Sequence, residues 1–133
     1  MTTRVVLQDD RIPELLAAMT NHANQAVRET IFDIARRSVI LMQGQKSGRE
    51  YPRPNGRMHQ ASAPGEAPAV DTGNLFNSIK AEMIGPKVGI VFTNVDYAPI
   101  LEFGGAKMEP RPFFAPATDA AWPGFLERMK RIF

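Results

Sequence analysis

The sequence predicts an α+β fold in which a long N-terminal amphipathic helix packs on a small antiparallel sheet, with a short second helix and a C-terminal helix. Three observations carry this prediction. Apolar residues repeat with a helical period over 12–42, two apolar runs flank a turn within 75–93, and a helical period returns near the C-terminus. The chain has 133 residues, 44% of them apolar, which suits one domain, residues 1–133, with a modest core.

The segment before the long helix is short and β-branched over residues 3–7, which favours an edge strand or a loose arm. Asp9 and Asp10 are expected to cap the helix that follows. Pro13 fits the first turn of that helix, where a missing backbone N–H costs nothing.

The longest periodic pattern runs from Ile12 to Met42 and places apolar side chains on one helical face. The opposite side carries charged residues, which we expect to face solvent or a neighbour, namely Arg28, Glu29, Asp33, Arg36 and Arg37. Gly44 is a suitable end for this helix. His22 lies near the apolar stripe, where an isolated imidazole is expected to be partly buried and structural.

Residues 44–74 are rich in Gly, Pro and Ser, show no helical or strand period, and form an unusually long connection for so small a domain. The connection is basic, because only Glu50 opposes a group of four cations, Lys46, Arg49, Arg53 and Arg57. The simpler interpretation is a solvated loop. The alternative is a surface that faces DNA or an acidic partner, although the net charge of +2 is small for a dedicated nucleic-acid binder.

Two short motifs in this region suggest enzymes; the nucleotide-binding one is rejected, and the protease one is a weak match. Gly44-Gln-Lys-Ser lacks the glycine that a phosphate-binding loop needs before its lysine. Asp71-Thr-Gly matches the aspartic protease motif, but that chemistry needs two carboxylates, and the flanking residues do not fit. The absence of cysteine excludes disulfides and thiolate nucleophiles, and two distant histidines leave little for a metal site. We therefore expect no enzyme activity, no cofactor and no metal.

A sharp turn is expected at Asp71-Thr-Gly-Asn, since Gly73 permits a positive φ. The next two apolar runs, 75–84 and 88–93, read as the strands of an antiparallel hairpin around Gly85-Pro-Lys.

A short helix is predicted from Tyr97, with Asp96 as its cap, Pro99 in its first turn and Gly104 or Gly105 at its end. Its apolar residues, which are Ile100, Leu101 and Phe103, are expected to face the core.

The run Arg111-Pro-Phe-Phe-Ala-Pro is rigid, because each proline fixes its own φ and favours extended backbone in the residue before it. A helix is expected from Pro116 to Ala121. Pro123 should interrupt it, and a terminal amphipathic helix should resume over 125–133.

Four ordered motifs resemble the lambdoid-phage gene-product-ten-like family. They are Ser62-Ala-Pro-Gly-Glu-Ala-Pro-Ala, then Asp71-Thr-Gly-Asn-Leu with Ser78-Ile79, then Tyr97-Ala-Pro with Glu102-Phe-Gly, and finally Arg111-Pro-Phe with Pro116-Ala117. The resemblance covers nearly the whole chain. The sequence departs from the family at Gly104-Gly105 and at the Trp122-Pro123 break.

The resemblance implies an α+β fold and a structural role in the virion, where such proteins join head to tail or complete the tail. It also implies a ring homo-oligomer, possibly a hexamer, around the DNA channel, with other phage neck or tail proteins as partners and non-specific contact with exiting DNA. The residues expected to contact subunits or partners are Arg53, Arg57, Pro64, Glu66, Asp71, Arg111, Phe113 and Phe114, and those expected to face DNA are Lys46, Arg49, Arg53 and Arg57.

The protein would be made in the host cytoplasm, because no window is apolar enough for a bilayer and the start lacks a signal peptide's apolar stretch. Three function classes follow in order: a structural assembly protein, a small nucleic-acid-binding module that uses residues 46–57, and a hydrolase as a distant third.

Overall fold

The structure, a computed structural model, describes residues 11–131. The segment 3–7 and the proposed caps Asp9 and Asp10 lie outside the described residues. The predicted α+β class is confirmed. The elements in order are α1 (Ile12–Gln43), β1 (Glu50–Pro52), β2 (Met58–Gln60), α2 (Asn74–Ser78), β3 (Lys80–Gly85), β4 (Val88–Phe92), α3 (Ala98–Phe103) and α4 (Phe114–Lys130).

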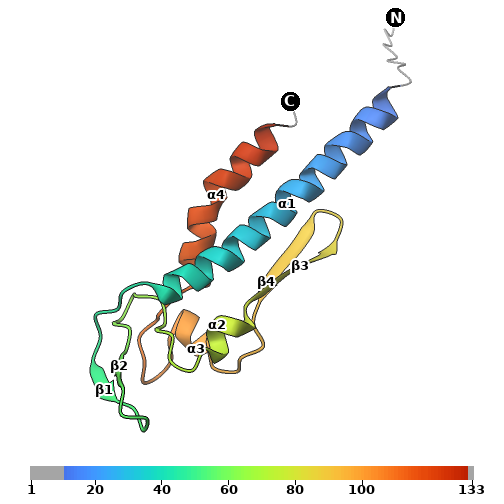
Figure 1. Ribbon diagram of the computed structural model, residues 1–133. Coiled ribbons are helices and arrows are strands. Elements are labelled where there is room, and N and C mark those ends of the chain that lie inside the picture. Colours follow the sequence, from blue (N-terminus) through green and yellow to red (C-terminus); the bar gives the residue numbers. More distant parts are fainter. Residues whose placement is uncertain (1–10, 132–133) are drawn as a thin grey trace, which may run out of the picture.

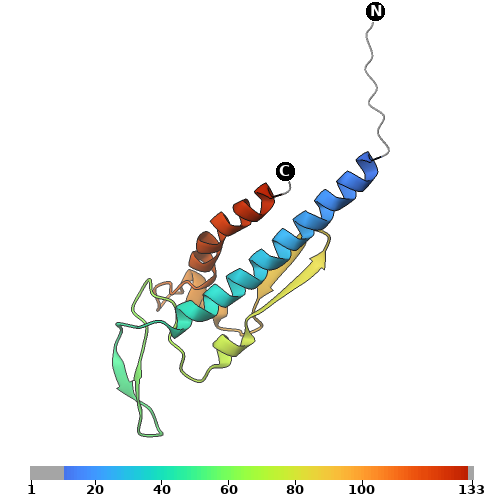
Figure 2. The same ribbon diagram turned by 45° about the horizontal axis from the view of Figure 1, so that its top comes forward.

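Helix α1 is the central element of the fold. It has 32 residues, Pro13 lies in its first turn, and Gly44 follows its end, as the sequence predicts. Figures 1 and 2 show α4 on one side of α1 and the β3–β4 hairpin on another. Because α1 separates these two elements, it must bury side chains on two sides, whereas the sequence analysis expected one stripe only.

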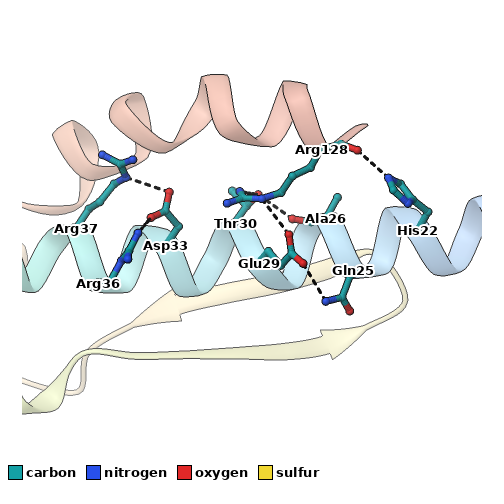
Figure 3. A network of polar contacts seen from close by, with 9 residues as sticks. All are labelled: His22, Gln25, Ala26, Glu29, Thr30, Asp33, Arg36, Arg37 and Arg128. Carbon is teal, nitrogen blue, oxygen red and sulfur yellow. Dashed lines mark hydrogen bonds and ion pairs between the residues drawn. The ribbon is translucent and has the colours of Figure 1, made fainter. Parts of the chain in front are cut away.

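The charged side of α1 is therefore partly covered by α4, and the expectation that it faces solvent is wrong for Asp33. Asp33 is 6% exposed, and Thr30 and Ser38 on the same helix are also buried. Burial alone would raise the pKa of Asp33, but hydrogen bonds from Arg36 (2.6 Å) and Arg37 (3.0 Å) outweigh that effect and hold it below its ordinary value. Figure 3 shows Asp33 and Arg37 on the side of α1 that faces α4.

Arg128 fixes α4 on α1 through its side chain and its backbone (Figure 3). Its guanidinium pairs with Glu29 (3.1 Å) and donates to the Thr30 hydroxyl (3.0 Å). Its carbonyl oxygen accepts a hydrogen bond from Nε2 of His22 (2.7 Å), which places the proton of a neutral His22 ring on that nitrogen. His22 is thus half-buried and structural, as expected.

Strands β3 and β4 form the predicted antiparallel hairpin, but the first strand begins at Lys80 and not at residue 75. Gly73, with φ +82°, starts the helical turn α2 instead, and this turn buries Leu75 in the core. Gly89 lies against α1: a β-carbon there would come within 2.7 Å of Cδ1 of Ile31. The hairpin therefore packs on α1 at close range.

The 44–74 connection contains a second hairpin that sequence analysis missed. Strands β1 and β2 pair antiparallel, with Tyr51 opposite His59 and Pro52 opposite Met58. Each strand has three residues, which is too short to show an alternating pattern. We call residues 48–61 the arm, because the ladder continues to Gly48 and Ala61 and the hairpin projects from the body in Figures 1 and 2.

Helix α3 ends at Gly104 (φ +83°), as predicted, and Pro99 lies in its first turn. Asp96 does not cap it, because Tyr97 already has helical dihedral angles and occupies the position before the helix. The expectation that all three apolar residues of α3 face the core is also wrong. Leu101 packs against the core, whereas Ile100 and Phe103 are 50% and 80% exposed.

Helix α4 begins at Phe114 and continues through Pro123, so the predicted interruption is wrong. An internal proline costs a helix about 3 kcal/mol, since one hydrogen bond is lost and the ring crowds the preceding turn. Packing on α1 offsets this cost: Ala117 and Ala121 are fully buried, and their small side chains let the two helices approach closely.

The hydrophobic core lies where the C-terminal end of α1 meets α2, α3 and the start of α4. Its buried members are Met42, Ala67, Leu75, Ala98 and Phe113. In the described part of the chain, no helix combines the length and hydropathy that a bilayer span requires.

Candidate partner-binding surface

Glu66 connects the two chain segments that flank the arm, at Ser47 and Ala63, which we call the root of the arm. Its carboxylate accepts hydrogen bonds from the backbone N–H of Ala63 (2.8 Å), from the backbone N–H of Ser47 (3.1 Å) and from the Ser47 hydroxyl. The Ser47 hydroxyl and these two backbone groups lower the pKa of Glu66 to about 2. Residues on both sides of the arm are thus tied to one carboxylate, which fixes where the arm leaves the body.

Two of the family-like motifs contact each other directly beside that root. Nη1 of Arg111 donates to the buried hydroxyl of Ser62 (2.9 Å), and the backbone N–H of Gly65 donates to the carbonyl of Pro110 (3.0 Å). Nε of Arg111 is buried and has no hydrogen-bond partner among the described residues. The motifs around residues 62–66 and 110–111 are therefore joined directly by hydrogen bonds.

Glu102 joins the third motif to the same region. One of its carboxylate oxygens accepts from the backbone N–H groups of Phe113 (2.8 Å) and Phe114 (3.0 Å), and the other from that of Ala115 (2.8 Å). These N–H groups belong to the start of α4, where no earlier turn can supply acceptors. The α3 carboxylate thus acts as the N-terminal cap of α4.

Asp71 lies against the arm. Its Oδ1 atom is 3.2 Å from Nε of Arg53 and 3.8 Å from Nδ1 of His59, whose ring stacks edge-on against Tyr51. Asp71 therefore holds the arm to the body through an ion pair. Across residues 11–131, no group of three or more His, Cys, Asp or Glu side chains is placed to hold a metal ion.

The predicted contact residues divide into two groups. Glu66, Arg111, Asp71 and Arg53 make contacts within the chain, and Phe113 is completely buried in the core. Pro64 and Arg57 are exposed, and Phe114 is half-buried against the core. The conspicuous motifs thus build the support for the arm, and the exposed surface around them is what a partner would meet.

The basic residues are also less free than the sequence suggests. Nζ of Lys46 donates to the carbonyl of Leu41 at the end of α1 (2.7 Å), and Arg53 pairs with Asp71. Arg49 and Arg57 are exposed, and neither side chain has an ion-pair partner among the described residues.

The surface feature that sequence analysis missed is a set of exposed apolar side chains. Many large apolar side chains in the described range are exposed. They come from α1, α3 and α4, from β2, β3 and β4, and from the loops: Leu15, Leu16, Phe32, Ile40, Leu41, Met58, Val70, Ile84, Val88, Tyr97, Ile100, Phe103, Trp122 and Leu126. By contrast, the large apolar side chains that are buried are Ile31, Met42, Leu75 and Phe113. This was missed because local pattern does not show which apolar residues will be buried. Those on α1 and in β3–β4 lie in patterns that normally indicate a core, whereas Met58 and Val70 lie in the connection that has no period.

No protein-family model matches the chain, and no curated protein or solved structure was found to be similar to it. The family resemblance of the four motifs stays a prediction.

Proposed function

We propose that this protein is a structural subunit of a phage or prophage virion, where it joins head to tail or completes the tail as a ring of identical copies around the DNA channel. The ordered motifs, which resemble the gene-product-ten-like family, support the virion setting. The exposed apolar side chains and the large accessible surface of the structure support assembly.

The observation that carries the proposal is the imbalance between exposed and buried apolar side chains. Within residues 11–131, fourteen large apolar side chains are exposed and only four are fully buried. Others are half-buried, including Phe76, Ile79, Val95, Leu101 and Phe114, which pack against the core. A domain of this size needs its large side chains for its core, so fourteen exposed ones are many. Single exposed apolar residues are normal on any surface, but neighbouring ones form patches that proteins bury against partners. Ile100 and Phe103 are such neighbours, because they lie three residues apart on α3 and are both exposed.

The total surface area points the same way. The accessible surface is 9601 Å², whereas a compact monomer of this size exposes about 6,900 Å². The terminal residues outside the described range would account for at most about 1,900 Å² of the difference, even if fully exposed. One copy alone therefore exposes more surface than a self-sufficient domain of its mass.

A ring requires that one surface of each copy fits a different surface of the next, and that the rotation closes. The structure offers different surfaces for such a contact. The arm projects at one end of α1, and apolar side chains are exposed on α3 and on the β3–β4 hairpin. The arm root is fixed by Glu66 and Asp71, so the projecting hairpin has a defined direction.

The proposal is tested by native mass spectrometry and electron microscopy of the purified protein, alone and mixed with the neck and tail proteins encoded beside it. We expect closed rings of one subunit number. We also expect particles made without this gene to have unjoined or incomplete tails. A protein that stays monomeric at every concentration and with every such partner would contradict the proposal.

The nucleic-acid-binding alternative is favoured by one observation, the exposure of Arg49 and Arg57 on the arm. It predicts DNA affinity at physiological salt that falls steeply as salt rises and is lost in Arg49→Ala/Arg57→Ala. Lys46 and Arg53 already make contacts within the chain. Replacing Arg49 and Arg57 should therefore be enough to abolish DNA binding. A DNA titration that shows no salt-sensitive binding would exclude this alternative.

A further inference from the structure

An apolar groove lies beside α3. It has a volume of about 570 Å³ and lies between α3, the segment after β4 and the start of α4. Its lining is mostly apolar, with Phe92, Val95, Phe103 and Phe114 among its residues, and Phe103 is 80% exposed. We call it the α3 groove.

The α3 groove also carries an acidic group. Asp96 lines it, is exposed, and has no hydrogen bond or ion pair with any described residue. Glu102 lines it too, but its two oxygens are occupied by the N–H groups at the start of α4. A ligand of this groove should therefore present an apolar side chain next to a single cation.

The end of the arm has that chemistry. Arg57 and Met58 are adjacent, Met58 is 62% exposed, and Arg57 is exposed without an ion-pair partner among the described residues. A methionine side chain is adaptable and packs favourably on aromatic rings such as those of the α3 groove. Arg57 would meet Asp96.

The end of the arm is already ordered for such a contact. The backbone N–H of Arg53 donates to the carbonyl of Arg57 (2.8 Å), and that of Gly56 donates to the carbonyl of Arg53 (2.9 Å). The backbone N–H of Arg57 donates to Oδ1 of Asn55 (3.0 Å). Because the turn is fixed in the single chain, docking would cost little conformational entropy.

We propose that Arg57 and Met58 of one copy dock in the α3 groove of the next copy, and that this is the head-to-tail contact that closes the ring. No residue of the arm lines the α3 groove of its own chain, and Figures 1 and 2 show the arm extending away from α3. This inference rests on the proposed assembly function and specifies the contact between copies.

A charge exchange tests the contact. Arg57→Glu and Asp96→Arg should each raise the concentration needed for assembly about tenfold or more, because a like charge then faces the partner. The double variant Arg57→Glu/Asp96→Arg should assemble like the unmodified protein. Arg49→Glu is the matched control, since it reverses an exposed arginine on the same arm and should assemble normally.

Mixing the two single variants gives a second readout. At the concentration where the unmodified protein just assembles, each variant alone should stay monomeric. Together they should form rings in which the variants alternate, because every contact is then between opposite charges. Folding is checked by the circular dichroism melting curve of dilute protein, below the concentration at which the unmodified protein assembles. That curve should not change, since neither side chain has an intramolecular ion pair among the described residues.

The outcomes separate this inference from the proposed function. If the unmodified protein forms rings and both single variants do so at the same concentration, the docking inference is overturned and the assembly function stands. If both single variants are impaired but neither the double variant nor the mixture recovers, the pairing of Arg57 with Asp96 is also overturned. If the unmodified protein never assembles, alone or with virion partners, the proposed function fails first.

Discussion

Glu102 illustrates how one side chain connects segments that sequence patterns treat separately. It lies on α3, yet its carboxylate receives the first free N–H groups of α4. The same residue was conspicuous in the sequence as part of Glu102-Phe-Gly, but spacing alone could not show that its partners follow eleven to thirteen residues later. A long-range cap of this kind is visible only in three dimensions.

Glu102→Ala should lower the free energy of unfolding by about 2 kcal/mol, because three backbone N–H groups lose their acceptor and the helix dipole loses a negative charge. Urea unfolding followed by circular dichroism measures this change. Glu109→Ala, an exposed carboxylate in the following loop, serves as control and should stay within about 0.5 kcal/mol of the unmodified protein. Equal effects of both replacements would contradict the capping role.

Glu66 gives a prediction for pH. Its folded pKa of about 2 lies below the ordinary value of 4.5, so ionised Glu66 stabilises the fold above about pH 4.5, and that contribution is lost as the pH falls toward 2. Glu66→Gln should therefore unfold at lower urea concentration than the unmodified protein near neutral pH. The difference between the two midpoints should shrink as the pH falls through this window. A difference that does not change with pH would show that the carboxylate charge is unimportant.

The elements of the fold differ in how well the sequence predicts them. The long period of α1 and the β3–β4 turn were predicted correctly, because each is a local pattern with a clear stop signal at Gly44 or at Gly85-Pro86. The β1–β2 hairpin was missed because its strands are three residues long. The path of α4 through Pro123 was missed because packing on α1 overrides a local preference.

The candidate partner-binding surface was also predictable only in part, because burial depends on tertiary contacts that local sequence does not show. The sequence motifs indicated segments that the structure brings together beside the arm, but Glu66, Arg111 and Phe113 act inside the chain. Which face of a short helix is buried depends on its neighbours, and a six-residue helix such as α3 is too short for its period to decide that. The exposure of Phe103 therefore could not be inferred from local pattern.

The contact between α1 and the β3–β4 hairpin can be tested by replacing two glycines of the hairpin, one at a time, with alanine. Gly89→Ala should destabilise the protein by about 1–3 kcal/mol, because the new β-carbon would lie 2.7 Å and 2.9 Å from two side-chain atoms of Ile31. Gly85→Ala is the matched control in the same hairpin, since a β-carbon there meets nothing within 4 Å. Thermal unfolding of both variants measures the difference, and equal melting temperatures would contradict the packing described.

At the scale of the whole molecule, the described residues 11–131 include few fully buried large apolar side chains for the surface they expose. If the proposed assembly is right, the stability of the protein should depend on its partners. If exposed apolar groups are buried on assembly, the melting temperature should rise with protein concentration, because association stabilises the folded state by mass action. Calorimetric scans over a wide concentration range check this. A melting temperature independent of concentration would contradict it.

Phe103→Ser should remove much of that concentration dependence while leaving the stability of the dilute, single chain nearly unchanged, because the side chain is 80% exposed. Lys107→Ser, an exposed change in the neighbouring loop, should leave both quantities as they are. If Phe103→Ser instead lowers the stability of the dilute protein to the same extent, the residue belongs to the fold of the single chain.

The length of α1 has a mechanical consequence. A straight helix of 32 residues spans about 48 Å, and here it connects the root of the arm to the far end of the described molecule. Arg128 of α4 contacts Glu29, Thr30 and His22 of α1, so we expect the two helices to move as one rigid unit. In the proposed assembly, a tilt imposed on the arm would displace the opposite end of α1 by a large distance, so a subunit would transmit orientation from one layer to the next.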